Sequence, residues 1–378
     1  MPWKETTTMM QRAEFVERAK EAGANLSGLC REYGISRKTG YKWIQRAEEQ
    51  GAAGLEDQSR RPRHSPGQTP VEVEGKVLEV REEYPEWGGR KIRRVMQNGG
   101  CPGVPAASTI TAILRRHEKI DPEEASKHQA FTRFEREQPN QLWQMDFKGF
   151  FTLQMGGHCH PLTVIDDHSR FLVGLKACPN ETSRTVQSQL SAIFEQFGLP
   201  EEMLMDNGSP WGLDRENPHT VLTAWLLRLG IAITHGRPYH PQTQGKDERL
   251  NRTLLEELIS KRAMATLQDS QRCFDQWRLT YNSIRPHEAL QLDTPASRYQ
   301  PSPRPFPAQL PPIAYLPGDV IRNVDSSGKI YFHGHRFHLS HAFGRQPVAL
   351  RPTQTEGIFD VFFCQFKVAQ ISLRKDNC

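Results

Sequence analysis

Three acidic residues that lie far apart in the chain constrain its fold more than any other feature. Asp146 lies in the apolar segment Leu-Trp-Gln-Met-Asp-Phe, Asp206 follows Met-Leu-Met, and Glu248 opens an amphipathic helix. Because 59 residues separate the first pair and 41 the second, only a folded core can bring the three carboxylates together. Two divalent cations about 3.5–4 Å apart, held by carboxylates, can clamp both the attacking and the leaving oxygen of a phosphodiester. The pattern therefore predicts a polynucleotidyl transferase.

The positive charge of the chain is concentrated at its two ends. Of a net charge of +5, residues 1–70 hold 12 Lys and Arg against 9 Asp and Glu, and residues 301–378 hold 9 against 5. Residues 139–300, which contain the three carboxylates, hold 16 against 18. This division predicts that a polyanionic partner binds to the basic regions at the two ends of the chain. The acidic, metal-binding segment between them would then act on that partner.

The sequence has no feature of an exported or membrane protein. No run approaches the ~18–20 apolar residues of a membrane span, and the first residues lack an apolar signal core. The seven cysteines are scattered without a Cys-x-x-Cys pair, which is typical of reduced thiols and not of a zinc module. We interpret His158-Cys159-His160 as turn residues, since neighbours on a strand point to opposite faces. We therefore expect a cytoplasmic, nucleoid-associated protein with no membrane partner.

Residues 1–58 predict a helix-turn-helix domain. Helices are expected over residues 9–22, 26–33 and 37–49, with Ser36 as the N-cap of the third. The start of such a third helix meets base edges in a major groove. The predicted DNA-binding side chains there are those of Arg37, Lys38 and Lys42. The alternative is a solvated helical hairpin whose charges only keep it soluble.

A second helix-turn-helix domain is predicted over residues 70–118. Ile110, Ile113 and Leu114 form an i, i+3, i+4 stripe on its last helix. Its predicted DNA-binding side chains are those of Arg90, Lys91, Arg115 and Arg116. A basic linker, residues 59–69, precedes this domain, and a charged connector, residues 119–138, follows it.

The segment 139–300 predicts a mixed five-stranded sheet with flanking helices, as in ribonuclease H. Strand and helix patterns alternate in the order β-β-β-α-β-α-β-α. The last of these helices carries the apolar stripe Leu250, Leu254, Leu255 and Leu258. Prolines mark residues 301–317 as a stiff spacer. Short strands with turn signals in residues 318–378 predict a small antiparallel β-barrel.

Three stretches of this core resemble the signatures of the integrase catalytic core. They are Trp-Gln-Met-Asp-Phe around Asp146, Asp-Asn-Gly-Ser from Asp206, and Tyr-His-Pro-Gln-Thr-Gln-Gly-Lys-Asp-Glu-Arg-Leu-Asn-Arg around Glu248. Asp166-Asp167-His168-Ser169-Arg170-Phe171 and Tyr281-Asn282 with Arg285-Pro286-His287 also resemble family stretches. The resemblance covers residues 139–300. Tandem helix-turn-helix modules, and no zinc module, precede this core. The resemblance therefore favours the bacterial insertion-sequence transposases of the DDE type over the retroviral integrases.

The resemblance implies a function, its cofactors and its partners. Asp146, Asp206 and Glu248 would be the catalytic residues and the ligands of two Mg²⁺ or Mn²⁺ ions. A DNA strand would be hydrolysed at each end of the element, and the freed 3′-hydroxyl would attack target DNA. The partners would be double-stranded DNA, at the element ends and the target, and further copies of this chain in a homodimer or higher multimer.

The surroundings of Glu248 leave two questions. The interval from Asp206 to Glu248 is longer than the family often shows, and residues 211–219 look like an insertion. Asp247 stands next to Glu248, and since adjacent helix positions lie about 100° apart, one of the two acids can bind metal while the other faces solvent. Alignment of the motif favours Glu248.

Basic residues crowd the same helix. Lys246, Arg249 and Arg252 are candidate phosphate contacts, although Arg252 is also placed for an i, i+4 ion pair with Glu248. We interpret Asp166 and Asp167 as turn residues and His168 as a structural histidine. Two other functions remain open, a ribonuclease H-like nuclease and a DNA-binding regulator with an inactive core.

Overall fold

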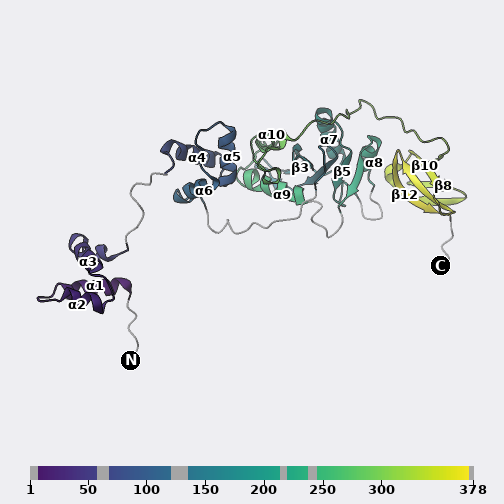
Figure 1. Cartoon of the computed structure of the whole chain (residues 1–378). Coiled ribbons are helices and arrows are strands. Elements are labelled where there is room, and N and C mark those ends of the chain that lie inside the picture. The colour runs from purple at the N-terminus through teal and green to yellow at the C-terminus, as the bar shows by residue number, and fades with distance from the viewer. Residues whose placement is uncertain (1–6, 58–67, 121–134, 213–218, 237–244, 374–378) are drawn as a thin grey trace. The chain divides into compact units, whose positions relative to one another are not determined.

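The computed structural model describes residues 7–57, 68–120, 135–212, 219–236 and 245–373 of the chain (Figure 1). It divides into two compact units, Met1–Gln68 and Thr69–Cys378, which are described separately. No helix in these described ranges is long and apolar enough to cross a membrane. The predicted linker and connector lie mostly outside them.

The first unit is a three-helix domain. Its helices are α1 (Thr8–Ala19), α2 (Leu26–Glu32) and α3 (Arg37–Gln50), followed by a 3₁₀ turn, Gly51–Leu55. The predicted N-cap is confirmed, because the Ser36 hydroxyl accepts a hydrogen bond from the Thr39 N–H at 3.1 Å. Gly40 lets α3 approach its neighbours closely, since a Cβ there would lie 2.7 Å from the Cys30 sulfur. Phe15 and Trp43 are buried in the core that results.

The second unit begins with another group of three helices. They are α4 (Val71–Glu83), α5 (Gly89–Asn98) and α6 (Ala107–Arg116). The stripe predicted on the last helix is confirmed, because Ile110, Ile113 and Leu114 are buried together with Trp87 from the α4–α5 loop. These helices therefore have a hydrophobic core of their own.

A mixed sheet follows, as predicted. Its strands are β1 (Leu142–Phe147), β2 (Phe151–Thr152), β3 (His158–Asp166), β4 (Leu172–Cys178), β5 (Glu202–Met205) and β6 (Ala232–His235). The five main strands have the order β4-β3-β1-β5-β6, and β1, β5 and β6 run parallel. The short strand β2 was not predicted. It pairs with the start of β3, so the interpretation of His158-Cys159-His160 as a turn was wrong.

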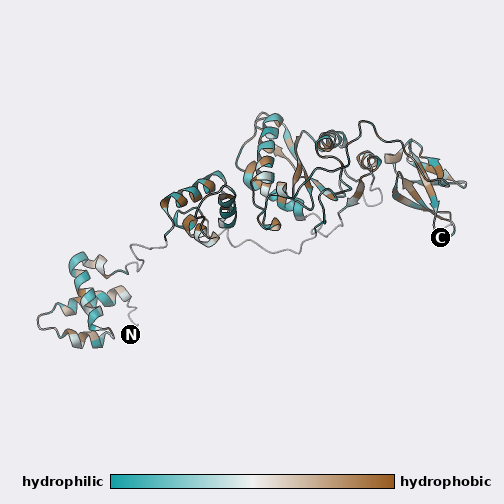
Figure 2. Ribbon diagram, turned by 45° about the horizontal axis from the view of Figure 1, so that its top comes forward, coloured by the Kyte–Doolittle hydropathy of each residue, from teal (hydrophilic) through white to brown (hydrophobic). Residues whose placement is uncertain are grey.

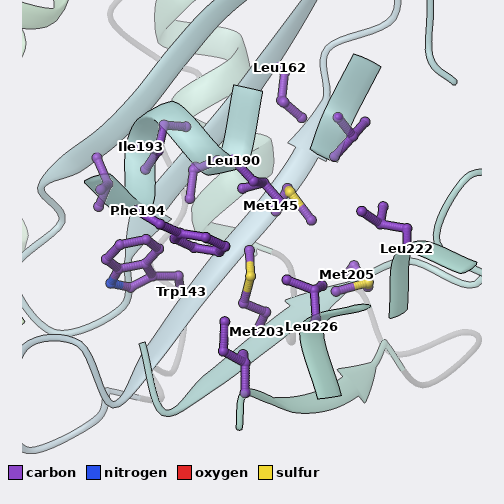
Figure 3. Packing of buried hydrophobic residues seen from close by; sticks show 14 of the residues in the cluster. Trp143, Met145, Leu162, Leu190, Ile193, Phe194, Met203, Met205, Leu222 and Leu226 are labelled. Atoms are coloured by element: carbon purple, nitrogen blue, oxygen red, sulfur yellow. The ribbon is translucent and has the colours of Figure 1, made fainter. Parts of the chain in front are cut away.

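Helices cover both faces of this sheet. They are α7 (Ser183–Phe197), α8 (Val221–Arg228), α9 (Gly245–Leu254) with a π-helical turn at Leu255–Ile259, and α10 (Leu267–Ser283). The helices carry hydrophobic and hydrophilic residues, as amphipathic helices do (Figure 2). Trp143 and Met145 of β1 pack with residues of α7 and α8 (Figure 3). Because side chains alternate along a strand, Gln144 and Asp146 point to the opposite face, which α9 and α10 cover.

The leucine stripe predicted on α9 is only partly correct. Leu250 and Leu254 are buried, whereas Leu255 is 39% exposed. The π-helical turn begins at Leu255 and changes the phase of the side chains beyond it.

Part of the predicted proline-rich spacer packs on the core. The Arg304 guanidinium donates to the carbonyls of Leu229 and Gly230 at 3.1 and 2.8 Å, and Phe306 packs against the cluster beneath α7 and α8. Two short 3₁₀ turns, Glu288–Leu290 and Pro295–Ser297, lead into this segment.

The last part of the chain is antiparallel, as predicted. Its strands are β7 (Val320–Asn323), β8 (Lys329–Phe332), β9 (His335–His338), β10 (Pro347–Pro352), β11 (Ile358–Phe363) and β12 (Phe366–Ser372), with a 3₁₀ turn at His341–Phe343. They form a four-stranded sheet, β12-β11-β10-β7, and a separate hairpin of β8 and β9. Strand pairing among the described residues does not close a barrel, although both sheets share one hydrophobic core.

Candidate active site

Strand register brings the first two predicted carboxylates to the same edge of the sheet. In the parallel pair, Leu142 lies opposite Glu202 and Gln144 opposite Leu204, a constant offset of sixty residues. The same offset sets Asp146 level with Asp206, which directly follows β5. Neighbouring strands lie about 4.8 Å apart. This register, and the effect of the Asp206 charge on Asp146, place the two acids near one another, while their catalytic role stays a prediction.

The environment of these two carboxylates disfavours their charged forms. Burial raises the pKa of Asp146 to about 6, and the negative charge of Asp206 adds to this effect. The Asn251 amide opposes the shift, because it donates to Asp146 Oδ2 at 3.0 Å. Burial also raises the pKa of Asp206, although the Gly208 N–H donates to its Oδ1 at 3.0 Å. Negative charge is thus concentrated at this edge, where a divalent cation would offset it.

Helix α9 presents a different acid to Asp146 from the one predicted. Asp247 is 1% exposed and lies close enough for the charge of Asp146 to raise its pKa, whereas Glu248, one position further along the helix, is exposed. Within the described ranges, no three His, Cys, Asp or Glu side chains gather closely enough to hold a metal ion. The role of Glu248 as the third ligand stays a prediction.

A buried ion pair fixes the beginning of α9. Lys246 is paired with Asp167, which is fully buried in the turn after β3. The Asp167 carboxylate also accepts hydrogen bonds from the Gln144 amide at 2.6 Å and the Arg136 N–H at 2.8 Å. Burial lowers the pKa of Lys246 to about 8, and Asp167 partly offsets this shift. Lys246 was predicted to contact DNA phosphate, and here it joins α9 to β1 and to that turn.

The family-like stretches outside the acids have structural roles. Asp166 accepts hydrogen bonds from the Asn140 and Ser169 N–H groups at 2.7 and 2.8 Å, as expected of a turn residue. His168 Nδ1 lies 2.8 Å from the Arg136 carbonyl. The Asn282 side chain accepts from the Leu172 N–H and donates to the Leu172 carbonyl, so it ties α10 to β4.

Two further residues near the acids, Glu181 and Asn251, were not predicted. Glu181 precedes α7, adds negative charge that raises the pKa of both Asp146 and Asp206, and has its Oε1 2.8 Å from His160 Nδ1. Asn251 lies one turn beyond Asp247. A polar residue one turn after a candidate ligand is a signal that could have identified Asn251, whereas nothing local in the sequence distinguishes Glu181.

The basic residues predicted on α3 are accessible. Arg37, Lys38 and Lys42 are exposed, and the Lys42 ammonium lies 4.2 Å from the centroid of the Trp43 ring. Trp43 itself is buried in the core of the first unit. Trp43 therefore anchors α3 in the core of the first unit, while Arg37, Lys38 and Lys42 are exposed to solvent.

Several cations of the second helical group are paired with acids. Arg90 lies 4.0 Å from Glu288. Burial lowers the pKa of Lys91 to about 8, and nearby Arg285 adds to this shift. Arg116 pairs with Glu74. The remaining predicted DNA-binding residues, all exposed, are Arg115 on α6 and Arg249 and Arg252 on α9. Contact of any of these side chains with DNA stays a prediction.

The raised pKa of Asp146 predicts how stability depends on pH in the absence of metal. The folded-state pKa is about 6 against an ordinary value of 3.8, so between these values the folded protein holds a proton that the unfolded chain releases. This contribution is present below pH 3.8 and lost as the pH rises through about 6. We expect the melting temperature, measured with chelator present, to fall over this window. In Asp146→Asn the fall should be smaller, and an unchanged profile would contradict the assignment.

Family comparisons agree with this arrangement. Residues 136–241 match a model described as an integrase core domain, and residues 229–295 match a second model with that description. Residues 319–378 match the C-terminal domain of IS481 family transposases. A helix-turn-helix model matches residues 11–63, and a homeodomain-like model matches residues 39–114.

Individual relatives are distant. An uncharacterized 39.2 kDa protein of insertion element IS476 from Xanthomonas euvesicatoria is 24% identical over 62% of this chain and 67% of its own length. An uncharacterized 31.7 kDa protein of insertion element IS407 from Burkholderia multivorans is 24% identical over 58% and 78%. The Gag-Pol polyprotein of avian reticuloendotheliosis virus is 27% identical over 51% of the chain, which matches only 16% of the polyprotein.

Solved structures that match part of the chain include viral integrases. The HTLV-2 integrase catalytic core domain in complex with magnesium is 17% identical and covers 43% of this chain and 99% of its own, with a TM-score of 0.34. A simian T-cell lymphotropic virus intasome chain is 17% identical and covers 79% and 100%, with a TM-score of 0.37.

Proposed function

Since the chain belongs to the insertion-sequence transposases that carry an integrase core domain, we propose that it cuts DNA at its element's terminal inverted repeats and joins the freed 3′-hydroxyls to target DNA. The observation that carries this proposal is the position of Asp146 level with Asp206 at one edge of the sheet. Burial raises the pKa of both carboxylates, and shifted pKa values of this kind are typical of functional sites, which supports the proposal.

The carboxylates around Asp146 are oxygen donors of the kind that Mg²⁺ and Mn²⁺ bind. Asp146 and Asp206 offer oxygen ligands, and the buried Asp247 carboxylate has no hydrogen-bond partner among the described residues. Such ions, when bound, would activate water or a 3′-hydroxyl and neutralise charge on the phosphate. Asp146, Asp206 and Glu248 would hold them. Asn251 would orient Asp146 through its amide N–H, and the buried Asp167–Lys246 pair would keep α9 in place.

The two helix-turn-helix groups would position the DNA. The helix-turn-helix match over residues 11–63 and the exposed cations of α3 support binding to double-stranded DNA by the first unit. The two ends of an element must be joined in one reaction, so the working form would be at least a dimer.

A strand-transfer assay tests this function. The full chain and Mg²⁺ are incubated with a labelled duplex that carries the element's terminal inverted repeat and with a target plasmid. We expect joined products that disappear in Asp206→Asn and persist in Glu201→Gln, an exposed acid at the other end of β5. Nicking without joining would indicate a nuclease. Specific binding with neither would indicate a regulator with an inactive core.

Neutralising the start of α3 should weaken DNA binding without affecting the fold. Each phosphate contact that is lost lowers the slope of log affinity against log salt by about 1. We expect Arg37→Gln and Lys38→Gln together to lower that slope by about 2 in fluorescence anisotropy, with an unchanged melting temperature, because both side chains are exposed. As a control, Glu48→Gln changes an exposed charge near the other end of the helix. Equal slopes in all three proteins would remove α3 from the DNA interface.

A further inference from the structure

The inner face of α9 carries two polar side chains near Asp146. Asp247 and Asn251 are four positions apart and therefore lie on one face of the helix. The Asn251 amide donates to Asp146 Oδ2 at 3.0 Å, which fixes this face against β1. Asp247 and Asn251 are 1% and 7% exposed, whereas Glu248 is exposed.

The part of the chain that the structure describes offers the buried Asp247 carboxylate no hydrogen-bond donor. Neither of its oxygens has a hydrogen-bond partner among the described residues. The side chains of Asp146, Asp167 and Lys246 lie close enough to interact with it electrostatically. Buried polar atoms are nearly always paired, and an isolated buried carboxylate is costly. A buried, unpaired carboxylate beside another acid therefore needs either a proton or a cation.

We propose that Asp247 is a fourth carboxylate of the metal site, which binds the cation held by Asp146. This inference rests on the proposed function, since it concerns the same ions. Asp247 would bind from the buried side of the site, and Glu248, on the adjacent exposed position, from the side that DNA approaches. Asp247 and Glu248 would then both bind metal, because side chains at adjacent helix positions point in directions about 100° apart. The alternative is that Asp247 is a protonated carboxyl with a structural role only.

Cation binding to the DNA-free full chain separates these possibilities. Mn²⁺ is titrated into wild type, Asp247→Asn, Asp146→Asn and the control Glu256→Gln by calorimetry, and melting temperatures are measured with and without Mn²⁺. Glu256 is an exposed acid in the π-helical turn after α9. We expect Asp247→Asn to weaken Mn²⁺ binding at least about tenfold and to reduce the thermal shift that Mn²⁺ produces. Without metal, this variant should melt no lower than wild type, because the amide carries no charge.

Each result decides one point. Suppose that Asp247→Asn binds Mn²⁺ as tightly as the control Glu256→Gln, and that Asp146→Asn binds it more weakly. Asp247 is then not a ligand, and only this inference fails. If Asp146→Asn also binds as wild type does, or wild type binds no Mn²⁺, the proposed function itself fails. Should Asp247→Asn not fold, Asp247→Ala takes its place in the same comparison, because alanine is smaller and also neutral.

Discussion

Replacing Asp146 with asparagine is expected to reduce strand transfer about a thousandfold or more and to leave the fold at least as stable. The loss follows because this carboxylate lies level with Asp206, where charge on the reacting phosphate must be offset. Stability should not fall, since burial already disfavours the charged form and raises the pKa of Asp146 to about 6. The amide keeps the shape of the side chain and removes the charge.

Two measurements check this expectation. Strand transfer is followed on a labelled terminal duplex, and stability by calorimetric melting in chelator. Glu201→Gln, which removes an exposed charge from the N-terminal side of β5, should match wild type in both. An Asp146→Asn protein that keeps a tenth of wild-type strand transfer would mean that the reaction takes place elsewhere.

Replacing Lys246 with methionine is expected to destabilise the core by about 3 kcal/mol. The change leaves Asp167 as an uncompensated charge in a fully buried position, and breaking one side of a buried ion pair costs about 3–5 kcal/mol. The lower end is expected, because the Gln144 amide and the Arg136 N–H still donate to that carboxylate. The free energy of unfolding is measured by urea titration with tryptophan fluorescence.

A double variant separates this role from a phosphate contact. Lys246→Met with Asp167→Asn removes both charges and should recover most of the lost stability, so the two changes are not additive. Arg252→Met, which removes an exposed cation from the same helix, should change stability by no more than about 0.5 kcal/mol. If Lys246→Met proves as stable as Arg252→Met and only DNA binding falls, the predicted phosphate contact is correct and the structural role is not.

The elements of the core could be predicted because each has a local signal. Helix α7 spans Ser183–Phe197, and the glycine directly after it, Gly198, is a local signal for its end. Strand β1 alternates Trp143 and Met145 with Gln144 and Asp146, and this period of two alone separates the packed face from the polar one. The sheet could be placed in a fold class because such elements alternate along the chain.

What the sequence did not show depends on contacts between distant segments. Leu255 fits the period of α9, but it lies where a π-helical turn begins and is 39% exposed, and no residue type marks that turn. Lys246 resembles any exposed lysine in the sequence, whereas the structure pairs it with Asp167, which is 79 residues earlier in the chain. Arg304 lies among prolines that predict a spacer, yet it binds carbonyls at the end of α8.

The sequence by itself determined most of the strands and helices, although not β2 or the start of β3, and it placed Asp146 and Asp206 at strand ends. It could do so because periodicity and turn residues act over a few neighbouring positions. Only the tertiary structure decided which acid of α9 faces them. That choice depends on the rotation of the helix about its axis, because adjacent residues point in directions that differ by about 100°. The contacts that set the rotation join α9 to β1 and to the turn after β3, through the pairs Asn251–Asp146 and Lys246–Asp167.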